Sequence, residues 1–116
     1  ACQTGAGANP LNICYTTGVG IRPPANPLHL DYRMSNQQPP EGLTVAGPMD
    51  ATYKIITEGY PWALNFLRPF VYPKIDQWPA IETFWDGCWI PPKNEYTVHQ
   101  MMAGNAYVWG YLAART

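Results

Sequence analysis

The C-terminal stretch Trp89-Ile-Pro-Pro-Lys-Asn-Glu-Tyr-Thr-Val-His-Gln100, which continues to Ala114, decides the fold. Its two adjacent prolines end the preceding element. Asn94 can cap a helix whose first turn contains Glu95, where a negative charge suits the positive end of the helix dipole. No proline follows, so the residues from Tyr96 to Ala114 predict one helix of ~18 residues, about 27 Å long.

The composition of this predicted helix indicates a buried element. Apolar side chains occupy all of its faces, and only His99, Gln100 and Asn105 interrupt them. A helix that is apolar on every side is ordinarily covered on every side, and this apolar run is too short to span a bilayer. We therefore expect the inner helix of a larger helical protein, most of whose other helices this chain does not encode.

Length and charge narrow the classes of function. The 116 residues suffice for one domain with a core, aromatic residues make up 14% and charged residues 13% of the chain, and the net charge is −1. Because no basic patch exists to hold a phosphate backbone, we expect no nucleic-acid partner. Aromatic side chains with few charges suit a protein that stacks flat apolar faces such as sugar rings, and they equally suit a core.

The three cysteines, Cys2, Cys14 and Cys88, lack metal-binding spacing, and no suitably spaced histidines accompany them. We expect no metal and no cofactor, and buried free thiols rather than a disulfide such as Cys14–Cys88. We recognise no signal peptide or membrane span. The opening Ala-Cys-Gln-Thr-Gly-Ala-Gly-Ala-Asn-Pro10 favours a fragment or a processed product of a longer protein.

The chain reads as one partial domain in three stretches. Residues 1–49 carry glycine or proline every few positions and predict ordered loops. Residues 50–90 predict short helices and aromatic loops, and residues 94–115 are the expected buried C-terminal helix. The smaller elements that we expect are extended pieces at Asn12–Thr17 and Leu43–Ala46, a helix from Ala51 to about Glu58 capped by Asp50, a turn at Trp62–Leu67, and one or two turns at Ala80–Trp85 with Pro79 in the first helical position.

The loop Thr16-Thr-Gly-Val-Gly-Ile-Arg-Pro-Pro-Ala-Asn-Pro-Leu-His-Leu-Asp-Tyr-Arg33 carries the most specific chemistry. Two glycines allow tight turns, and three prolines stiffen the backbone that follows. The loop thereby presents Arg22, His29, Asp31 and Arg33 from a rigid platform. Such a set can hold polar hydroxyls, and it can equally form a structural salt-bridge cluster.

Three blocks of the sequence resemble the signatures of family-9 glycoside hydrolases, in the same order. Asn9-Pro-Leu-Asn-Ile-Cys-Tyr-Thr-Thr-Gly-Val-Gly20, followed by Arg-Pro-Pro and Asn-Pro-Leu-His, is similar to a Tyr-Val-Thr-Gly-Phe-Gly segment that precedes Pro-His-His-Arg. Pro40-Glu-Gly-Leu-Thr-Val-Ala-Gly-Pro48 is similar to Pro-Gly-Leu-Leu-Val-Gly-Gly-Pro. Glu95-Tyr-Thr-Val-His-Gln100, leading into Asn105-Ala106, resembles the signature around the catalytic acid. The match covers nearly the whole chain and the C-terminal quarter of such an enzyme.

The resemblance implies a mostly α-helical chain with long ordered loops that forms the C-terminal part of an (α/α)6 barrel. The implied enzyme is secreted or extracellular and hydrolyses β-1,4-glucans with inversion. Inversion uses one carboxylic acid as proton donor and a second carboxylate, about 6.5–9.5 Å away, to activate water. The family's water-activating aspartates lie in an N-terminal part that this chain lacks. We therefore expect an inactive isolated chain, whose partners are a β-glucan and the missing part of the barrel or another chain.

The resemblance also places individual residues. The proton donor falls at Gln100, whose amide has no titrating proton, and the family aspartate nine residues earlier falls at Pro91. His29 takes the place of the second histidine of the sugar-binding loop. The first histidine falls at Leu28 and the arginine at Leu30, and Arg33, three residues later, is the expected substitute for that arginine. The implied substrate-binding residues are Arg22, His29, Arg33, Trp85, Trp89 and Tyr96, the two tryptophans by stacking on sugar rings unless they pack against the last helix.

Three accounts of Gln100 stay open. It is an introduced Glu→Gln change that traps substrate, or a natural divergence in which Glu95, Glu82 or Asp86 supplies the proton, or a mark of a non-catalytic chain that binds glycan. Glu95 also fits a plain capping role in the first turn of a helix. A further alternative is a small stand-alone enzyme that uses Glu82 or Asp86 together with His29.

Overall fold

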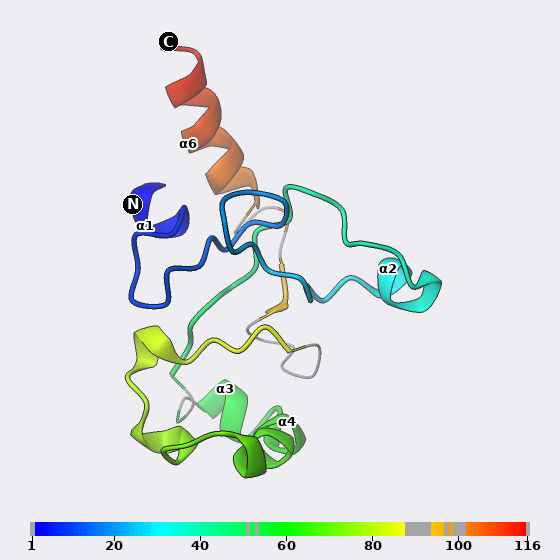
Figure 1. Ribbon diagram of the computed structural model, residues 1–116, viewed down its shortest axis with the longest axis vertical. Coiled ribbons are helices and arrows are strands. Elements are labelled where there is room, and N and C mark those ends of the chain that lie inside the picture. Colours follow the sequence, from blue (N-terminus) through cyan, green and yellow to red (C-terminus); the bar gives the residue numbers. More distant parts are fainter. Residues whose placement is uncertain are drawn as a thin grey trace.

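The computed structural model describes residues 2–50, 52, 54–87, 94–96, 98 and 102–115. Within them, short helices are joined by long loops, and an isolated antiparallel bridge joins Thr16 to Thr44 (Figure 1). The helices are α1 (Cys2–Gly5), α2 (Leu30–Ser35), α3 (Lys54–Thr57), α4 (Pro61–Leu67), the 3-10 turns η1 (Arg68–Phe70), η2 (Ile75–Gln77) and η3 (Ala80–Glu82), and α6 (Ala103–Ala113). Membership of an (α/α)6 barrel stays a prediction.

One apolar core forms around α4, at the end of the molecule opposite α6 (Figure 1). Pro61 opens this helix, where its fixed φ and missing N–H suit the first turn. Leu64 and Leu67 lie on the buried face of α4 and pack with Ile75 of η2. Burial of each leucine contributes about 1.5–3 kcal/mol. The turn predicted at Trp62–Leu67 is this helix.

The other short elements between residues 50 and 87 differ in detail from the prediction. Asp50 accepts hydrogen bonds from the N–H and the hydroxyl of Thr52, both at 2.8 Å, just before α3. The predicted start of that helix at Ala51 lies outside the described residues. In η3, Pro79 is the N-cap and not the first helical residue, and the helix ends after one turn. The Thr83 hydroxyl donates to the carbonyl of Ala80 there (2.7 Å), which uses a carbonyl that a longer helix would need.

The two extended pieces predicted in the first fifty residues pair with each other over Tyr15–Thr17 and Leu43–Val45, whereas Asn12, the predicted start of the first piece, has a left-handed φ of 52°. The N–H of Val45 donates to the carbonyl of Tyr15, and the N–H of Thr17 donates to the carbonyl of Leu43, both at 2.9 Å. The buried Thr17 hydroxyl adds two bonds, to the Pro40 carbonyl (2.6 Å) and from the Leu43 N–H (2.9 Å). This pairing gives the loop-rich half its framework.

Helix α2 lies in a stretch that we predicted to be loop. It buries no side chain, so its sequence shows no apolar periodicity. The helix ends at Asn36, whose φ of 53° is left-handed, and the N–H of that residue bonds to the carbonyl of Tyr32. Asparagine tolerates this conformation better than most residues. The stop signal is thus local, although the helix itself was missed.

The helix predicted from Tyr96 to Ala114 begins later in the structure. α6 spans Ala103–Ala113, Val98 and Met102 before it are π-helical, and neither Glu95 nor Tyr96 is helical. Asn94 does not cap α6, because its side-chain amide donates to the carboxylate of Asp86 (3.2 Å). The interpretation of residues 94–96 as the first turn of one long helix is therefore wrong.

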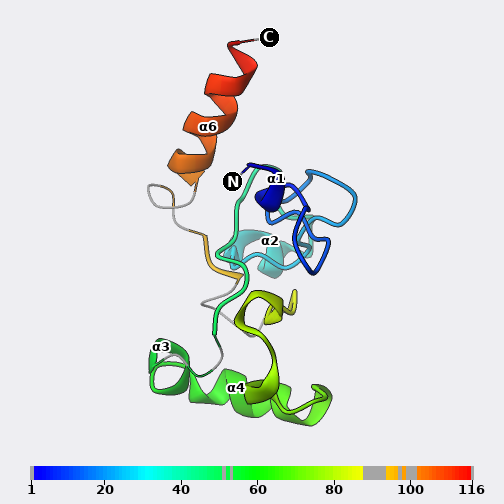
Figure 2. The ribbon, with the colours of Figure 1, turned by 90° about the vertical axis from the view of Figure 1, so that its left-hand side faces the viewer.

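The described residues do not cover α6. The helix projects from the body of the molecule in both views (Figures 1 and 2), and none of its residues is buried. The Tyr107 side chain is 78% exposed and that of Tyr111 is 54% exposed. The predicted burial would thus need cover from outside this set of residues. Within the same set, no helix has the length and apolarity needed to cross a membrane.

Candidate functional site

The proline loop, by which we mean residues Arg22–Arg33, is anchored to Asp86. The N–H of Ala25 donates to Oδ2 of this carboxylate (2.5 Å), and the N–H of Asn26 donates to Oδ1 (3.0 Å). The Asn26 side chain also donates to the main-chain carbonyl of Asp86 (2.7 Å). Because prolines already restrict the loop backbone, these three bonds hold it in one orientation.

The far end of the proline loop folds back on its own backbone. The Tyr32 hydroxyl lies within hydrogen-bond distance of the carbonyls of Ala25 (3.3 Å) and Pro27 (3.1 Å). Nη2 of Arg33 donates to the carbonyl of Asn26 (3.0 Å). Arg33, to which the resemblance gives a sugar hydroxyl, therefore has a structural bond that closes the loop.

The segment Asn94–Tyr96 lies against the proline loop. The N–H of Leu28 donates to the carbonyl of Asn94 (2.8 Å), and the fully buried Asn94 side chain reaches Asp86. The ring of Tyr96 is stacked on the imidazole of His29, with centroids 6.0 Å apart and planes inclined by 13°. Asp86 thus connects two segments that are distant in the sequence.

The proline loop, Asp86 and the Asn94–Tyr96 segment together form what we call the cluster. Two of its buried polar atoms, Nδ1 of His29 and Oδ1 of Asn94, have no hydrogen-bond partner among the described residues. A buried polar atom without a hydrogen-bond partner lowers the stability of a folded protein by about 1–3 kcal/mol. Buried polar atoms that have no protein partner usually bind ordered water or a ligand. These two atoms therefore provide unused hydrogen-bonding capacity beside the His29–Tyr96 pair.

Glu95 carries an exposed carboxylate at the same place. Its main-chain carbonyl accepts the N–H of Ala46 (2.9 Å), which joins its backbone to the second of the two paired extended segments. The side chain itself is exposed, and it comes between Asn94 and Tyr96 in the chain. The segment Asn94–Tyr96 therefore carries one exposed acid, between a buried amide and an aromatic ring in the sequence.

The other carboxylates weighed from the sequence lie differently. The oxygens of Asp86 are used by the proline loop and by Asn94. Glu82 belongs to η3, next to Thr83, whose hydroxyl bonds to the carbonyl of Met49. Met49 packs on the α4 core, so the residue that follows Glu82 in the chain is tied to a residue of that core.

Two further residues predicted to bind substrate also make contacts elsewhere. Nη1 of Arg22 donates to the carbonyl of Leu11 (3.3 Å). Trp85 is half-buried, packs against the α4 core and meets Trp78 edge to face, with centroids 5.6 Å apart. The structure thus brings His29 and Tyr96 together. Arg22 and Trp85 instead make the contacts described above, with Leu11 and with the α4 core.

Some of the predicted residues cannot be placed. Trp89 and Gln100 lie outside the described residues, as do Cys88 and the side chain of Cys2. Cys14 is a buried free thiol, as the sequence predicted. In the part of the chain that the structure describes, no group of three or more His, Cys, Asp or Glu side chains is arranged to hold a metal.

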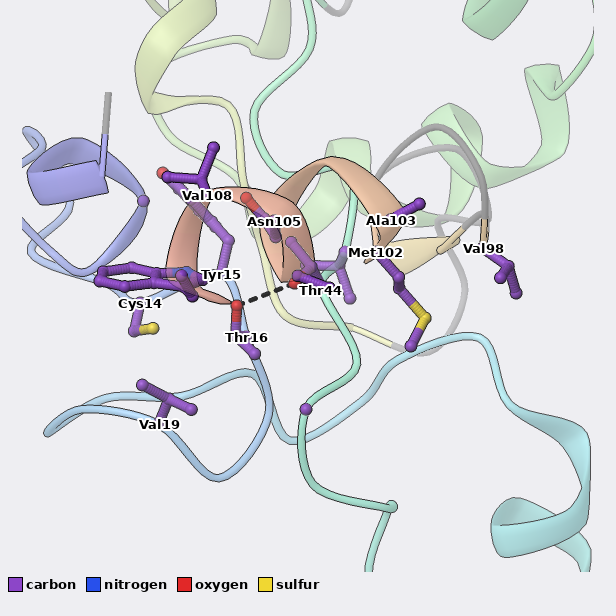
Figure 3. Close-up of a pocket in the computed structure, with 15 residues that line it drawn as sticks. Cys14, Tyr15, Thr16, Val19, Thr44, Val98, Met102, Ala103, Asn105 and Val108 are labelled. Carbon is purple, nitrogen blue, oxygen red and sulfur yellow. Dashed lines mark hydrogen bonds between the residues drawn. The ribbon is translucent and has the colours of Figure 1, made fainter. Parts of the chain in front are cut away.

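A second feature is a cavity of about 750 Å³ between α6 and the paired segments (Figure 3). The hydroxyls of Thr16 and Thr44, 2.9 Å apart, lie among largely apolar lining residues such as Val108 and Met102. Tyr15 also lines it, and the hydroxyl of this residue is buried without a hydrogen-bond partner among the described residues. Burial raises the pKa of Tyr15 above its ordinary value of 10.0.

Sequence reasoning missed the anchoring role of Asp86 and the part played by Asn26. Asp86 was weighed only as a proton donor. Asn26 stands before a proline in a stiff loop, which indicates an ordered side chain, but no local pattern identifies an acceptor sixty residues away.

Comparison with known proteins leaves the geometry of this cluster as the guide to function. A scan against protein-family models, a search of curated proteins and a search of solved structures each found no match to this chain.

Proposed function

We propose that this chain supplies the sugar-binding and proton-donating part of a family-9-like enzyme that hydrolyses β-1,4-glucans with inversion. The observation that supports the proposal best is the stacking of His29 on Tyr96, together with the buried unpaired atoms Nδ1 of His29 and Oδ1 of Asn94 and the exposed carboxylate of Glu95, which precedes Tyr96 in the chain. Aromatic faces, hydrogen-bonding groups and an acid are the parts that glycoside binding and cleavage need.

Sugar binding follows from the chemistry of the His29–Tyr96 pair. A pyranose ring has an apolar face, which packs on flat side chains, and a rim of hydroxyls, which need donors and acceptors. Nδ1 of His29 and Oδ1 of Asn94 can serve hydroxyls once neighbouring groups move to admit them. Binding would then relieve the cost of leaving these two atoms unpaired.

Glu95 is the proton donor in this proposal, in place of Gln100. A glutamine amide carries no titrating proton, whereas a carboxylic acid does. Asp86 is a poor candidate because its oxygens accept bonds from backbone N–H groups, and Glu82 lies in η3, next to a residue that is tied to the α4 core. The second carboxylate, which activates water, would come from the rest of the barrel, so the chain alone binds glucan without turnover.

Titration of the isolated chain with cellohexaose tests the binding part of the proposal. We expect heat of binding with cellohexaose and none with maltohexaose, which has the same sugars in α-1,4 linkage. His29→Ala should weaken the affinity about tenfold, a loss of ~1.4 kcal/mol, whereas Tyr72→Ala should not, because Tyr72 is 93% exposed and far from the cluster in the sequence. Equal binding of both hexaoses, or none of either, would reject the proposal.

Assays of turnover test the role of Glu95. Reducing-sugar release from soluble cellulose should be absent for the isolated chain. In the complete enzyme that the proposal requires, Glu95→Gln should abolish hydrolysis and leave cellohexaose binding nearly unchanged. If instead Gln100→Glu raises activity by orders of magnitude, position 100 supplies the proton and the assignment to Glu95 fails.

A non-catalytic glycan-binding or structural chain is the second candidate. It is favoured by the engagement of Asp86 in loop anchoring, because a carboxylate whose oxygens hold the loop is not free to take part in hydrolysis. Under this alternative, Glu95→Gln in the complete protein would change neither binding nor sugar release.

A further inference from the structure

We propose that Asp86 is a positioning residue that sets the geometry between the proline loop and the Asn94–Tyr96 segment. It holds His29 in register with Tyr96 and takes no part in proton transfer. The anchoring itself follows from the hydrogen bonds, and its consequence for glucan affinity rests on the function proposed above.

The acceptor geometry at Asp86 requires a carboxylate. Two consecutive backbone N–H groups, of Ala25 and Asn26, donate to different oxygens of the same side chain, at 2.5 and 3.0 Å. Oδ1 also accepts Nδ2 of Asn94 (3.2 Å). A carboxylate offers about four acceptor positions on two oxygens, whereas an amide offers acceptors on one oxygen only. In Asp86→Asn, one N–H of the loop would face the side-chain NH2 of the new asparagine, which is a donor and cannot accept a hydrogen bond.

The two sets of bonds converge on the stacked rings. On one side, Ala25 and Asn26 lead along a proline-stiffened backbone to His29. On the other side, Asn94 is two residues before Tyr96, and its carbonyl accepts the Leu28 N–H (2.8 Å). Loss of the carboxylate therefore removes side-chain anchoring from both sides of the His29–Tyr96 contact and leaves the Leu28–Asn94 main-chain bond as the direct link between them.

The same geometry argues against the role of Asp86 as an acid. The contacts that the structure gives its oxygens come from N–H donors, and none of these groups is a leaving-group oxygen that an acid could protonate. An acid must instead reach the bond to be cleaved.

Amide hydrogen exchange tests the anchor without any sugar. In the wild-type chain, the N–H groups of Ala25 and Asn26 should exchange slowly. Asp86→Asn should accelerate both at least about tenfold. The matched control is Asp50→Asn, which removes a carboxylate that also accepts local bonds but lies before α3. Unchanged exchange in Asp86→Asn would overturn the proposal.

The effect on sugar affinity separates positioning from general destabilisation. Asp86→Asn should weaken cellohexaose binding about tenfold at a temperature where the variant is fully folded. Combined with His29→Ala, it should cause little further loss, because both changes then act through one contact. Additive losses would overturn the proposed route through His29.

Two further outcomes distinguish a failure of the Asp86 anchor from a failure of the proposed glucan binding. If the wild-type chain binds no cellohexaose, the proposed function fails, and the exchange experiment alone decides whether Asp86 anchors the loop. If Asp86→Asn does not fold, exchange in the wild-type chain decides, because the anchor consists of the Ala25 and Asn26 N–H bonds to the Asp86 carboxylate. Slow exchange of both N–H groups supports the anchor, and exchange at the rate of an unprotected peptide rejects it.

Discussion

The imidazole of His29 lies over the ring of Tyr96, with their centroids 6.0 Å apart and their planes inclined by 13°. One residue belongs to the stiff loop near the N-terminus, and the other follows the exposed acid Glu95. An aromatic pair of this kind contributes about 0.5–1.5 kcal/mol beyond its burial, so each ring helps to hold the other in place.

Substitution of Tyr96 should therefore lower glucan affinity more than removal of an isolated aromatic ring. We expect Tyr96→Ala to weaken cellohexaose binding about tenfold, through loss of a stacking face and of support for His29. Tyr72→Ala is the control, because that ring is 93% exposed. Calorimetric titration measures both, and equal affinities for the two variants would contradict the importance of the stacked pair.

The buried hydroxyl of Thr17 should contribute strongly to stability. It donates to the Pro40 carbonyl and accepts the Leu43 N–H, and Thr17→Val would leave both groups without this partner at unchanged volume. We expect a loss of about 2 kcal/mol in the free energy of unfolding. Urea denaturation provides the measurement. The exposed Thr57→Val should change the same quantity by less than about 0.5 kcal/mol, and similar losses at the two sites would contradict the prediction.

Tyr15 should make stability fall at alkaline pH. Because its pKa is raised in the folded protein above the ordinary 10.0, the unfolded chain releases the phenolic proton first as pH rises. The folded state then binds more protons than the unfolded state, so the free energy of unfolding decreases above about pH 10. Urea midpoints at neutral and alkaline pH should show this decrease in the wild type.

Tyr15→Phe should reduce that alkaline loss. At neutral pH it should cost little, because the buried hydroxyl that it removes has no hydrogen-bond partner among the described residues. Tyr72→Phe, which changes an exposed phenol, should leave the alkaline decrease as it is in the wild type. The prediction fails if both variants behave alike.

The exposed apolar surface of α6 should make the isolated chain associate. Apolar surface of this kind is an aggregation liability when nothing covers it. Tyr107→Lys places a charge at a position that is 78% exposed, so it should lower the sedimentation coefficient at high concentration. Tyr72→Lys adds the same charge at a site outside α6. Equal association of the two variants would show that α6 does not mediate it.

Local sequence determined several elements that the structure contains. Pro61 marks the start of α4, and the two threonine-containing extended pieces occur where they were expected. The end of the C-terminal helix was also close to prediction, since α6 ends at Ala113. These features depend on interactions between near neighbours in the chain, which residue type largely sets.

The start of that helix was misjudged for a long-range reason. Asn94 is a good cap by residue type, yet its amide bonds to Asp86, and Glu95 accepts the N–H of Ala46 through its carbonyl. Bonds to distant partners compete with the helix for these groups. A prediction from local helix propensity takes no account of these competing hydrogen bonds. For this reason, the predicted helix began too close to the N-terminus.

By itself, the sequence determined a stiff loop with His29 at its end, an acid at Glu95 and an apolar C-terminal helix. Tertiary structure alone decided that Asp86 joins the loop to the Asn94–Tyr96 segment and that His29 meets Tyr96. The physical reason is that the contacts of the loop with Asp86 and with Tyr96 join residues sixty or more positions apart. Their formation depends on closure of the whole intervening chain, which no neighbouring residue specifies.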